Sequence, residues 1–440
     1  MEENMKAHII EGANTNVLYF PNSYKFFKID DLTKNIICDI HEEMNKSEII
    51  EKYNIGEEDY YDLHQIVNDT TSSLTELQAG PKGLYKLVLN ITNECNLNCV
   101  YCYANGGTYQ SDKGVMQREV LEQALSIFFN RYNNIGVIQL FGGEPTLNLN
   151  AIAYVGAYIE QKLQNKEIDY KPVLCLTTNG MCSSEKFIDL VNRYDIKLTV
   201  SIDGPRSVTN QTRLANTGAG VADILEDNIQ KLRARTGQPQ SAEVTFTQLH
   251  VEQDIEVREV VNYLGTRFGI TDVHVSPVSA EEGAAYKLKN RDSFLKAIPE
   301  VIRNKEDGYM LVNRIIDNLR TKRMDRHICN AGTSIYSVSS SGDIYPCFML
   351  TDVWEHRLGN VNSVDEEFWS ELESPANPFR RFDKLKNEQC KDCFNNTMCN
   401  GCMGINHFGT GDIFKSPEEE CSFLKGLTEQ VLLALCEEDK

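Results

Sequence analysis

Short apolar runs alternate with longer amphipathic stretches through the middle of the chain. The runs are rich in β-branched residues and are typical of buried strands at 84–91, 137–141, 173–178, 197–202, 242–248 and 272–276. Apolar positions at helical spacing predict helices over 116–134, 149–166, 184–194, 220–235 and 252–268. This alternation predicts an α/β class with a parallel sheet, in the form of an open (β/α)6 partial barrel similar to a TIM barrel. Functional side chains are then expected at the carboxyl ends of the strands.

The first eighty residues have a different pattern. Residues 16–20 and 24–29 read as two strands joined by a turn at Pro21-Asn22-Ser23. An amphipathic helix is expected over 32–44, and further helices over 47–53 and 57–74. The sequence therefore predicts a small α+β module ahead of the barrel.

Length and charge narrow the class of protein. A chain of 440 residues is long enough for about three domains. Its net charge of −20 argues against nucleic-acid binding and weakly suggests a partner with basic residues, although solubility is the simpler explanation. The first residues are charged and no apolar run reaches membrane length, so we expect a cytoplasmic protein without a signal peptide or membrane contact.

The most informative motif directly follows the first predicted strand. Cys95, Cys99 and Cys102 have the spacing C-x-x-x-C-x-x-C, with an aromatic residue before the third cysteine. Three thiolates can hold three irons of a [4Fe–4S] cube and leave the fourth iron open to a ligand. A structural zinc site would need four ligands, and the odd number of closely spaced cysteines disfavours disulfides.

This motif resembles the signature of the radical SAM superfamily. The resemblance implies an enzyme whose open iron binds S-adenosylmethionine (SAM), and whose 5′-deoxyadenosyl radical takes a hydrogen atom from the substrate. It also implies an external one-electron reductant such as flavodoxin or ferredoxin. Oxygen-sensitive clusters fit the reducing cytoplasm, where disulfides are rare.

Further candidate SAM-binding residues stand at the ends of the second, third and fourth strands. Alone, a Gly-Gly-Glu-Pro run is most often a turn, and single Ser or Arg residues are most often surface or capping residues. By the resemblance, the Gly-Gly-Glu segment binds the SAM amine, the serine and the arginine bind its carboxylate, the Thr-Asn pair lies near the ribose, and the tyrosine packs near the adenine. The residues are Tyr101, Gly142, Gly143, Glu144, Thr178, Asn179, Ser201 and Arg213.

Seven cysteines form a second pattern in the C-terminal third. They are Cys329, Cys347, Cys390, Cys393, Cys399, Cys402 and Cys421. Metal ligation explains them better than disulfides in a reduced iron–sulfur enzyme. Two zinc knuckles remain an alternative for the paired C-x-x-C motifs.

The seven-cysteine pattern resembles the SPASM domain, which carries two auxiliary [4Fe–4S] clusters. The resemblance implies three clusters in all, with Cys390, Cys393, Cys399 and Cys421 on an outer cluster and Cys329, Cys347 and Cys402 on an inner one. Cys402 follows Cys399 after two residues instead of the usual three. The other cysteines outside the radical SAM motif read as structural, since free cysteine is commonly buried; they are Cys38, Cys175, Cys182 and Cys436.

The N-terminal module resembles a RiPP recognition element, a winged-helix-like fold that binds the leader of a ribosomally made precursor peptide as an added strand. The alternative is a cap without a ligand. Together, these features resemble a radical SAM/SPASM peptide maturase that forms cysteine thioethers, the sactipeptide and ranthipeptide type. We expect recognition in 1–80, the barrel in 81–285, a helical bridge in 286–325 and the auxiliary clusters in 326–440.

Other functions stay open on the sequence alone. Carbon–carbon crosslinking and sulfatase-type maturation of a protein residue share the same radical start. The sulfatase-maturating branch has an aspartate just after the cysteine matching Cys347, where this chain has Phe348. A non-catalytic metal-binding peptide scaffold is a different class, and the candidate SAM-binding residues count against it. No residue is assigned as the catalytic acid or base.

Overall fold

A nine-stranded sheet forms the framework of the computed structural model, which describes residues 7–69, 71–76, 83–109, 111–280, 283–304 and 309–438. Its order is β10-β9-β8-β7-β6-β5-β12-β13-β14. The six strands of the predicted barrel are parallel and lie in chain order, as expected for a partial barrel. They are β5 (Leu84–Thr92), β6 (Ile135–Gly142), β7 (Val173–Thr178), β8 (Lys197–Ser201), β9 (Ser241–Phe246) and β10 (Asp272–Pro277).

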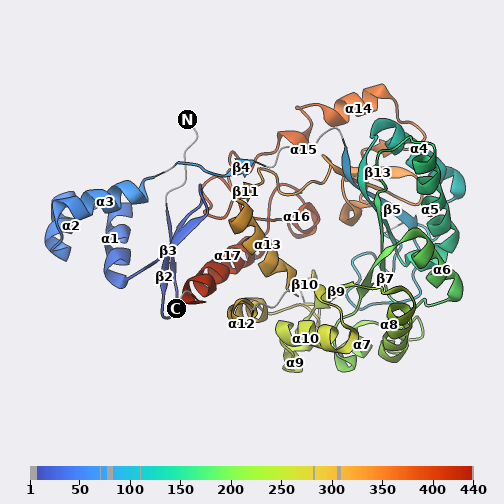
Figure 1. Ribbon diagram of the computed structural model, residues 1–440, viewed down its shortest axis with the longest axis horizontal. Coiled ribbons are helices and arrows are strands. Elements are labelled where there is room, and N and C mark those ends of the chain that lie inside the picture. The colour runs from blue at the N-terminus through green and yellow to red at the C-terminus, as the bar shows by residue number, and fades with distance from the viewer. Residues whose placement is uncertain are drawn as a thin grey trace.

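Helices connect these strands and surround the sheet (Figure 1). They are α4 (Arg118–Arg131), α5 (Leu149–Gln164), α6 (Glu185–Tyr194), α7 (Arg206–Thr212), α8 (Ala222–Thr236), α9 (Gln248–Glu252) and α10 (Val257–Phe268), with the short 3-10 helix η1 at Pro145–Asn148. The prediction of an α/β partial barrel is confirmed. Some details differ, because the short helices α7 and α9 were not predicted and the helix expected over 252–268 begins only at Val257.

Alternation along the strands separates the two faces of the barrel wall. On β9 and β10, Val244, Phe246, Val273 and Val275 are fully buried in a core with residues of α8 and α10. Because neighbouring side chains on a strand point to opposite faces, the residues between them face the interior of the barrel.

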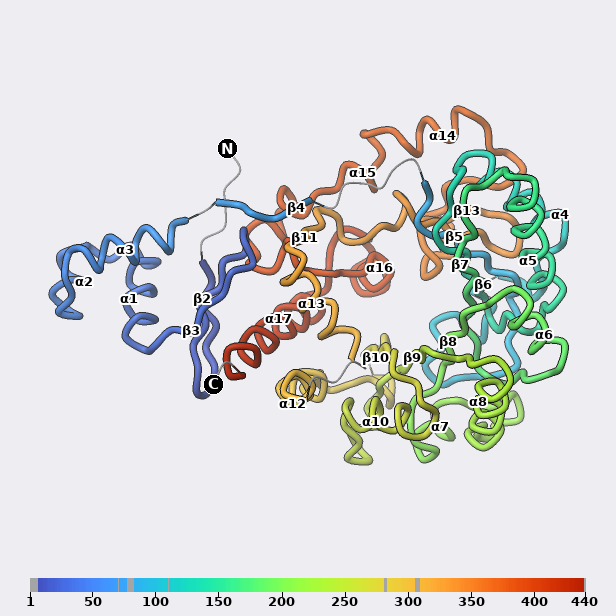
Figure 2. Tube along the Cα trace, viewed as in Figure 1, coloured from blue at the N-terminus to red at the C-terminus, as the bar shows by residue number. Residues whose placement is uncertain are grey.

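The N-terminal module contains a three-stranded antiparallel sheet with the order β1-β2-β3. Its elements are β1 (His8–Glu11), β2 (Asn16–Phe20), β3 (Lys25–Ile29), α1 (Asp31–His41), α2 (Lys46–Tyr53) and α3 (Glu57–Val67). The predicted strands and helices are present, β1 was not predicted, and α3 ends earlier than expected. In Figure 2 the three helices lie at the opposite end of the molecule from α4, α5 and α6.

A short helical segment leads from the barrel to the C-terminal region. It contains α11 (Asp292–Lys296), α12 (Ile298–Arg303) and α13 (Met310–Thr321), and then β11 (Arg323–Met324), which pairs with β4 (Thr75–Glu76). These helices lie within 286–325, the range expected for the bridge, and the domain division itself stays a prediction. The expected boundary between residues 80 and 81 lies outside the described residues.

The C-terminal region extends the barrel sheet instead of forming a separate one. Its strand β12 (Ile335–Val338) pairs in parallel with β5, and β13 (Asp343–Tyr345) and β14 (Gly359–Asn360) follow in antiparallel order. The remaining elements are η2 (Phe348–Leu350), η3 (Trp354–His356), α14 (Glu366–Glu373), α15 (Pro378–Arg381), α16 (Met403–Thr410) and α17 (Glu418–Glu438).

Helix α17 joins the N-terminal sheet to the rest of the molecule. Val431 and Leu432 are buried in the same core as Val17 and Tyr19 of β2 and as Ile298 of α12. His8 also stacks on Phe394, with ring centroids 3.7 Å apart. The N-terminal module is thus packed against the C-terminal region. Among the described helices, none is long and apolar enough to cross a membrane.

Candidate functional site

The three cysteines of the first motif lie in the loop after β5, at the carboxyl edge of the sheet. Backbone bonds from Asn98 N–H to the Leu214 carbonyl and from Val100 N–H to the Thr212 carbonyl dock this loop beside the end of α7. The thiols of Cys95, Cys99 and Cys102 interact with one another electrostatically. The structure therefore brings together the three predicted ligands of the SAM-binding cluster.

Burial raises the pKa of Cys95 and of Cys99, so neither thiol readily forms a thiolate on its own. Burial, together with the nearby charges of Glu144, Cys99 and Cys102, raises the pKa of Cys95 to about 11. Metal ions bind the deprotonated form and displace the proton. A thiol set that is buried, clustered and unassisted by nearby lysines fits metal ligation better than a free nucleophile.

The Gly-Gly-Glu segment is held tightly against the cysteine loop. Gly143 N–H donates to the Thr92 carbonyl and Glu144 N–H to the Glu94 carbonyl. A Cβ atom on Gly143 would lie 2.3 Å from the Glu94 carbonyl oxygen, so only glycine fits there. These amides donate to the cysteine loop, and the Glu144 carboxylate is fully buried and hydrogen-bonded within the protein. Backbone carbonyls of the segment are therefore the acceptors that remain for an ammonium group.

Glu144 joins the ends of β6 and β7. Its fully buried carboxylate accepts bonds from Thr178 Oγ1 at 2.8 Å and from Asn179 N–H at 2.7 Å. Burial raises its pKa, although the hydrogen bonds from Thr146, Asn179 and Thr178 oppose that effect. Asn179 Nδ2 in turn donates to Asn96 Oδ1 in the cysteine loop at 2.8 Å. Three of the predicted SAM-binding positions are therefore linked directly to the cysteine loop.

A buried aspartate organises the next part of the site. Asp203 accepts hydrogen bonds from the Tyr101 hydroxyl at 2.6 Å, from the Thr212 hydroxyl at 2.6 Å and from Arg213 Nη2 at 3.0 Å. Burial alone would raise its pKa, but the Arg213 charge and the two hydroxyl donors lower it below the ordinary value. Asp203 is not among the SAM-binding residues that the sequence predicts.

Arg213 keeps one group available for a ligand. Its Nε is buried and has no hydrogen-bond partner among the described residues. Ser201, its predicted companion, is the last residue of β8 on the same edge of the sheet. A buried, unpartnered guanidinium donor suits an anionic group such as the SAM carboxylate.

The seven C-terminal cysteines gather as two groups. Cys390 interacts electrostatically with Cys393, Cys399 and Cys421, and burial together with these charges raises its pKa to about 11. Cys347 interacts in the same way with Cys402 and Cys329, and its pKa rises to about 12. These groups have the same members as the predicted outer and inner sets, including Cys402 with its shortened spacing.

One polar pair on the barrel interior was missed by the sequence analysis. Glu243 of β9 lies between Ser201 of β8 and His274 of β10 in the parallel register. His274 Nδ1 and Glu243 Oε2 are 2.8 Å apart. Burial would lower the pKa of His274, but the hydrogen bond and charge of Glu243 raise it overall. The signal was present, since a histidine between Val273 and Val275 must face away from the core.

Comparison with known proteins agrees with this geometry. Residues 89–264 match the family model of the Radical SAM superfamily. The chain carries a radical SAM domain, and it is a radical SAM enzyme. Residues 329–394 match the SPASM model, an iron–sulfur cluster-binding domain. The enzyme uses SAM with one SAM-binding [4Fe–4S] cluster and two auxiliary [4Fe–4S] clusters.

Three similar proteins place the radical SAM enzyme among its relatives. A cysteine-type anaerobic sulfatase-maturating enzyme of Clostridium perfringens is 25% identical over 338 residues, which are 72% of this chain and 87% of the relative. The structure of native anSMEcpe with bound AdoMet superposes with a TM-score of 0.66 at 20% identity, over 81% of this chain and all of that one. Streptococcus suis SuiB bound to the precursor peptide SuiA gives 0.55 at 15% identity, over 92% and 96% of the two chains.

Proposed function

We propose that this radical SAM enzyme modifies a ribosomally made peptide and closes thioether crosslinks from a cysteine sulfur to a carbon of another residue. One observation carries the proposal. Tyr103, directly after Cys102, interacts electrostatically with Cys102 and also with Cys347 and Cys402 of the inner group. The SAM-cluster loop and the inner cysteine group thus both lie close to one tyrosine, so a peptide bound near it would have access to both.

The inner group has three cysteines where the outer group has four. A cluster held by three protein thiolates leaves room for a further ligand, and a cysteine thiolate of the peptide has the right chemistry. When bound, SAM and its cluster supply a 5′-deoxyadenosyl radical that abstracts a hydrogen atom from a carbon. Each thioether takes one hydrogen atom from that carbon and one proton from the thiol, and the electron left over when the sulfur–carbon bond forms would pass to an auxiliary cluster. Every crosslink therefore lowers the peptide mass by two hydrogens.

The thiol proton needs an acceptor, and we assign that role to His274. Its imidazole faces the barrel interior in the same row as Ser201, and its raised pKa makes the neutral imidazole a stronger base. Glu243 orients the ring through its hydrogen bond and stabilises the imidazolium that forms. Arg314 opposes this effect and Asp272 supports it, both more weakly than Glu243.

The N-terminal module is proposed to bind the leader of the peptide. Strand β3 has β2 as its neighbour on one side and is the last strand of its sheet in the described part of the chain. Lys25, Phe27 and Lys28 on this strand are exposed. An exposed edge accepts a peptide as an added strand through main-chain hydrogen bonds. Leader binding there would raise the effective concentration of the rest of the peptide at the radical site.

A sulfatase-type maturation of one protein residue is the second candidate, favoured by the Clostridium perfringens relative. The side chain after Cys347 argues against it. Phe348 packs against Phe141 on the interior side of β6, with ring centroids 4.8 Å apart, where the sulfatase branch would have a carboxylate. An aromatic pair cannot accept a proton, so this chain needs a base from another position.

Anaerobic co-expression with a candidate precursor peptide encoded beside the gene, followed by intact and tandem mass spectrometry, tests the proposal. We expect loss of two hydrogens per site together with cysteines that no longer react with an alkylating reagent. Loss of hydrogens with alkylatable cysteines would instead establish carbon–carbon crosslinking. A single altered residue without a crosslink would favour the sulfatase-type function.

A further inference from the structure

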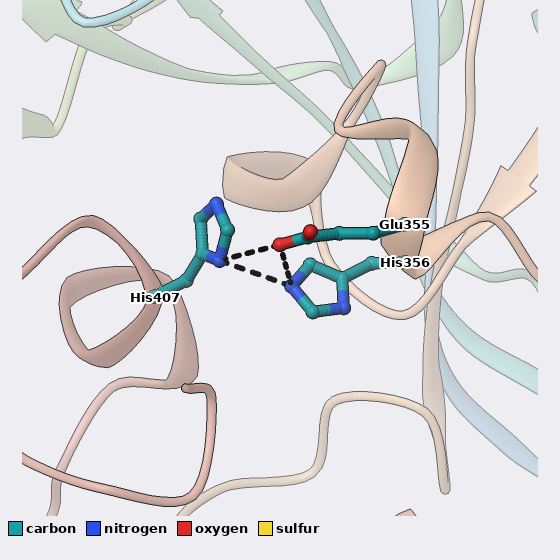
Figure 3. A group of neighbouring side chains, drawn as sticks. All are labelled: Glu355, His356 and His407. Atoms are coloured by element: carbon teal, nitrogen blue, oxygen red, sulfur yellow. Dashed lines mark hydrogen bonds and ion pairs between the residues drawn. The ribbon is translucent and has the colours of Figure 1, made fainter. Parts of the chain in front are cut away.

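A cluster of two histidines and one glutamate lies in the C-terminal region and contains no cysteine. Glu355 and His356 belong to η3, and His407 belongs to the last turn of α16. Figure 3 shows the three side chains pointing toward one another from these two segments. From this cluster we infer a third kind of metal centre, a mononuclear site for a divalent transition metal of the zinc class.

The distances among the three donor atoms match one face of a metal tetrahedron. His356 Nε2 is 3.1 Å from His407 Nδ1, Glu355 Oε1 is 3.2 Å from His407 Nδ1, and Glu355 Oε1 is 3.4 Å from His356 Nε2. Zinc–ligand bonds of about 2.0–2.1 Å at tetrahedral angles place neighbouring ligand atoms about 3.3 Å apart. One ion can therefore bind all three atoms without rearrangement of the backbone.

Burial and charge also suit a metal. The side chains of His356 and His407 are only 14% and 16% exposed, whereas Glu355 is 59% exposed. An imidazole in its neutral form offers a ring-nitrogen lone pair to a metal ion. Two imidazoles and one carboxylate form a common zinc ligand set, and the fourth position remains open for water.

The proposed metal site would join two segments that are distant in sequence. His407 and His356 are 51 positions apart in sequence, and α16 begins directly after Cys402, its N-cap residue. An ion on these three ligands would fix η3 to the helix that follows an inner-group cysteine. The ligand class is a borderline divalent cation, because imidazole nitrogen suits zinc better than the hard cations calcium and magnesium.

Zinc binding by the iron-loaded enzyme tests the inference. The protein is purified anaerobically, treated with a mild chelator, dialysed against excess Zn²⁺ and then titrated with a chromophoric competitor, with zinc and iron counted by mass spectrometry. We expect wild type to hold one zinc that His356→Gln and His407→Gln bind at least 100-fold more weakly. His64→Gln, which changes an exposed histidine on α3, is the matched control.

Two further measurements keep the outcome unambiguous. Iron content and thermal unfolding show whether a variant has folded, and Glu355→Gln removes a ligand charge at an exposed position. X-ray absorption at the zinc edge should give nitrogen and oxygen neighbours. Equal zinc affinity in wild type and all variants, or a zinc surrounded only by sulfur, would overturn the inference, because the metal would then lie at cysteines.

Discussion

Arg213 Nη2 donates to Asp203 Oδ1 across 3.0 Å in an ion pair whose two side chains are 7% and 0% exposed. The same carboxylate also accepts from Tyr101 in the cysteine loop, so one aspartate links the loop, β8 and the segment after α7. A buried ion pair adds little to the stability of the folded state when it is compared with an apolar pair of similar size. Removing only one partner is costly, because the other charge is then left buried without compensation. Asp203 is therefore a positioning residue for the SAM site.

Asp203→Asn should destabilise the protein by about 3–5 kcal/mol and weaken SAM binding, because it leaves the Arg213 charge buried and unpaired. Thermal unfolding under anaerobic conditions and equilibrium dialysis with SAM measure the two effects. Asp272→Asn at an exposed carboxylate is the control, expected within about 0.5 kcal/mol of wild type. Unchanged SAM affinity in a folded Asp203→Asn protein would remove Asp203 from the site.

The ion pair between Asp203 and Arg213 makes the stability of the protein fall as the pH is lowered. The pKa of Asp203 is lowered in the folded protein, so its contribution to stability is fully present above the ordinary aspartate pKa. It is lost as the pH falls through the lowered folded value. Wild type should therefore lose more stability on acidification than Asp203→Asn does.

The sequence predicts those parts of the site whose residues are close together along the chain, and it does not predict those that only folding brings together. Cys95, Cys99 and Cys102 are close in sequence, so their spacing alone describes a cluster loop. The barrel strands are recognisable because both faces of the sheet exclude charge except at a few interior positions. His356 and His407 come together only through the packing of η3 against α16, and no periodicity connects them. Strands β12, β13 and β14 were missed because they are short and gain stability mainly from pairing with β5 and with one another.

Gly143→Ala should impair loading of the SAM-binding cluster without changing any ligand. The added methyl group would lie 2.3 Å from the Glu94 carbonyl, so the peptide directly before Cys95 must move. Anaerobic reconstitution followed by iron counting should show about four irons fewer than wild type, one cube's worth. Gly114→Ala is the matched control because a Cβ there meets nothing within 4 Å. Full iron loading in both variants would show that the loop tolerates the shift.

Cysteine replacements should separate the three clusters by iron count and activity. Wild type should hold about twelve irons, three cubes of four. Replacing Cys95, Cys99 and Cys102 together by Ala should remove about four irons and abolish SAM cleavage, while leader binding persists. Cys421→Ala should reduce the iron of the outer group, whereas Cys182→Ala should leave the count unchanged. SAM cleavage that survives the triple replacement would contradict the assignment of the radical site.

Phe27→Ala should weaken leader binding several-fold without slowing SAM cleavage. Phe27 is 53% exposed on β3, the strand proposed to pair with the leader, and its ring offers apolar surface beside the main-chain bonds. Fluorescence anisotropy with a labelled leader peptide measures the affinity. Tyr170→Ala removes a 49% exposed aromatic ring on the barrel side and should bind the leader normally. Equal losses in both variants would show that the effect does not arise from β3.

The His274–Glu243 pair predicts how the rate of crosslinking depends on pH. His274→Gln should leave SAM cleavage largely intact but slow crosslinking by about 10²–10⁴-fold, the usual contribution of a positioned base. In wild type, crosslinking should fall on the acid side as His274 becomes protonated. Glu243→Gln removes the group that raises the pKa of His274, so this acid limb should move to lower pH.

Rates of SAM cleavage and of peptide crosslinking, measured in parallel across pH, show whether His274 accepts the thiol proton. His64→Gln, at an exposed histidine on α3, is the control and should keep the wild-type profile because it leaves the 2.8 Å contact between Glu243 and His274 in place. An acid limb that stays in place in Glu243→Gln would mean that another group accepts the thiol proton. Loss of SAM cleavage and crosslinking to the same extent in His274→Gln would place His274 in SAM binding, since SAM cleavage itself does not require a base for the thiol.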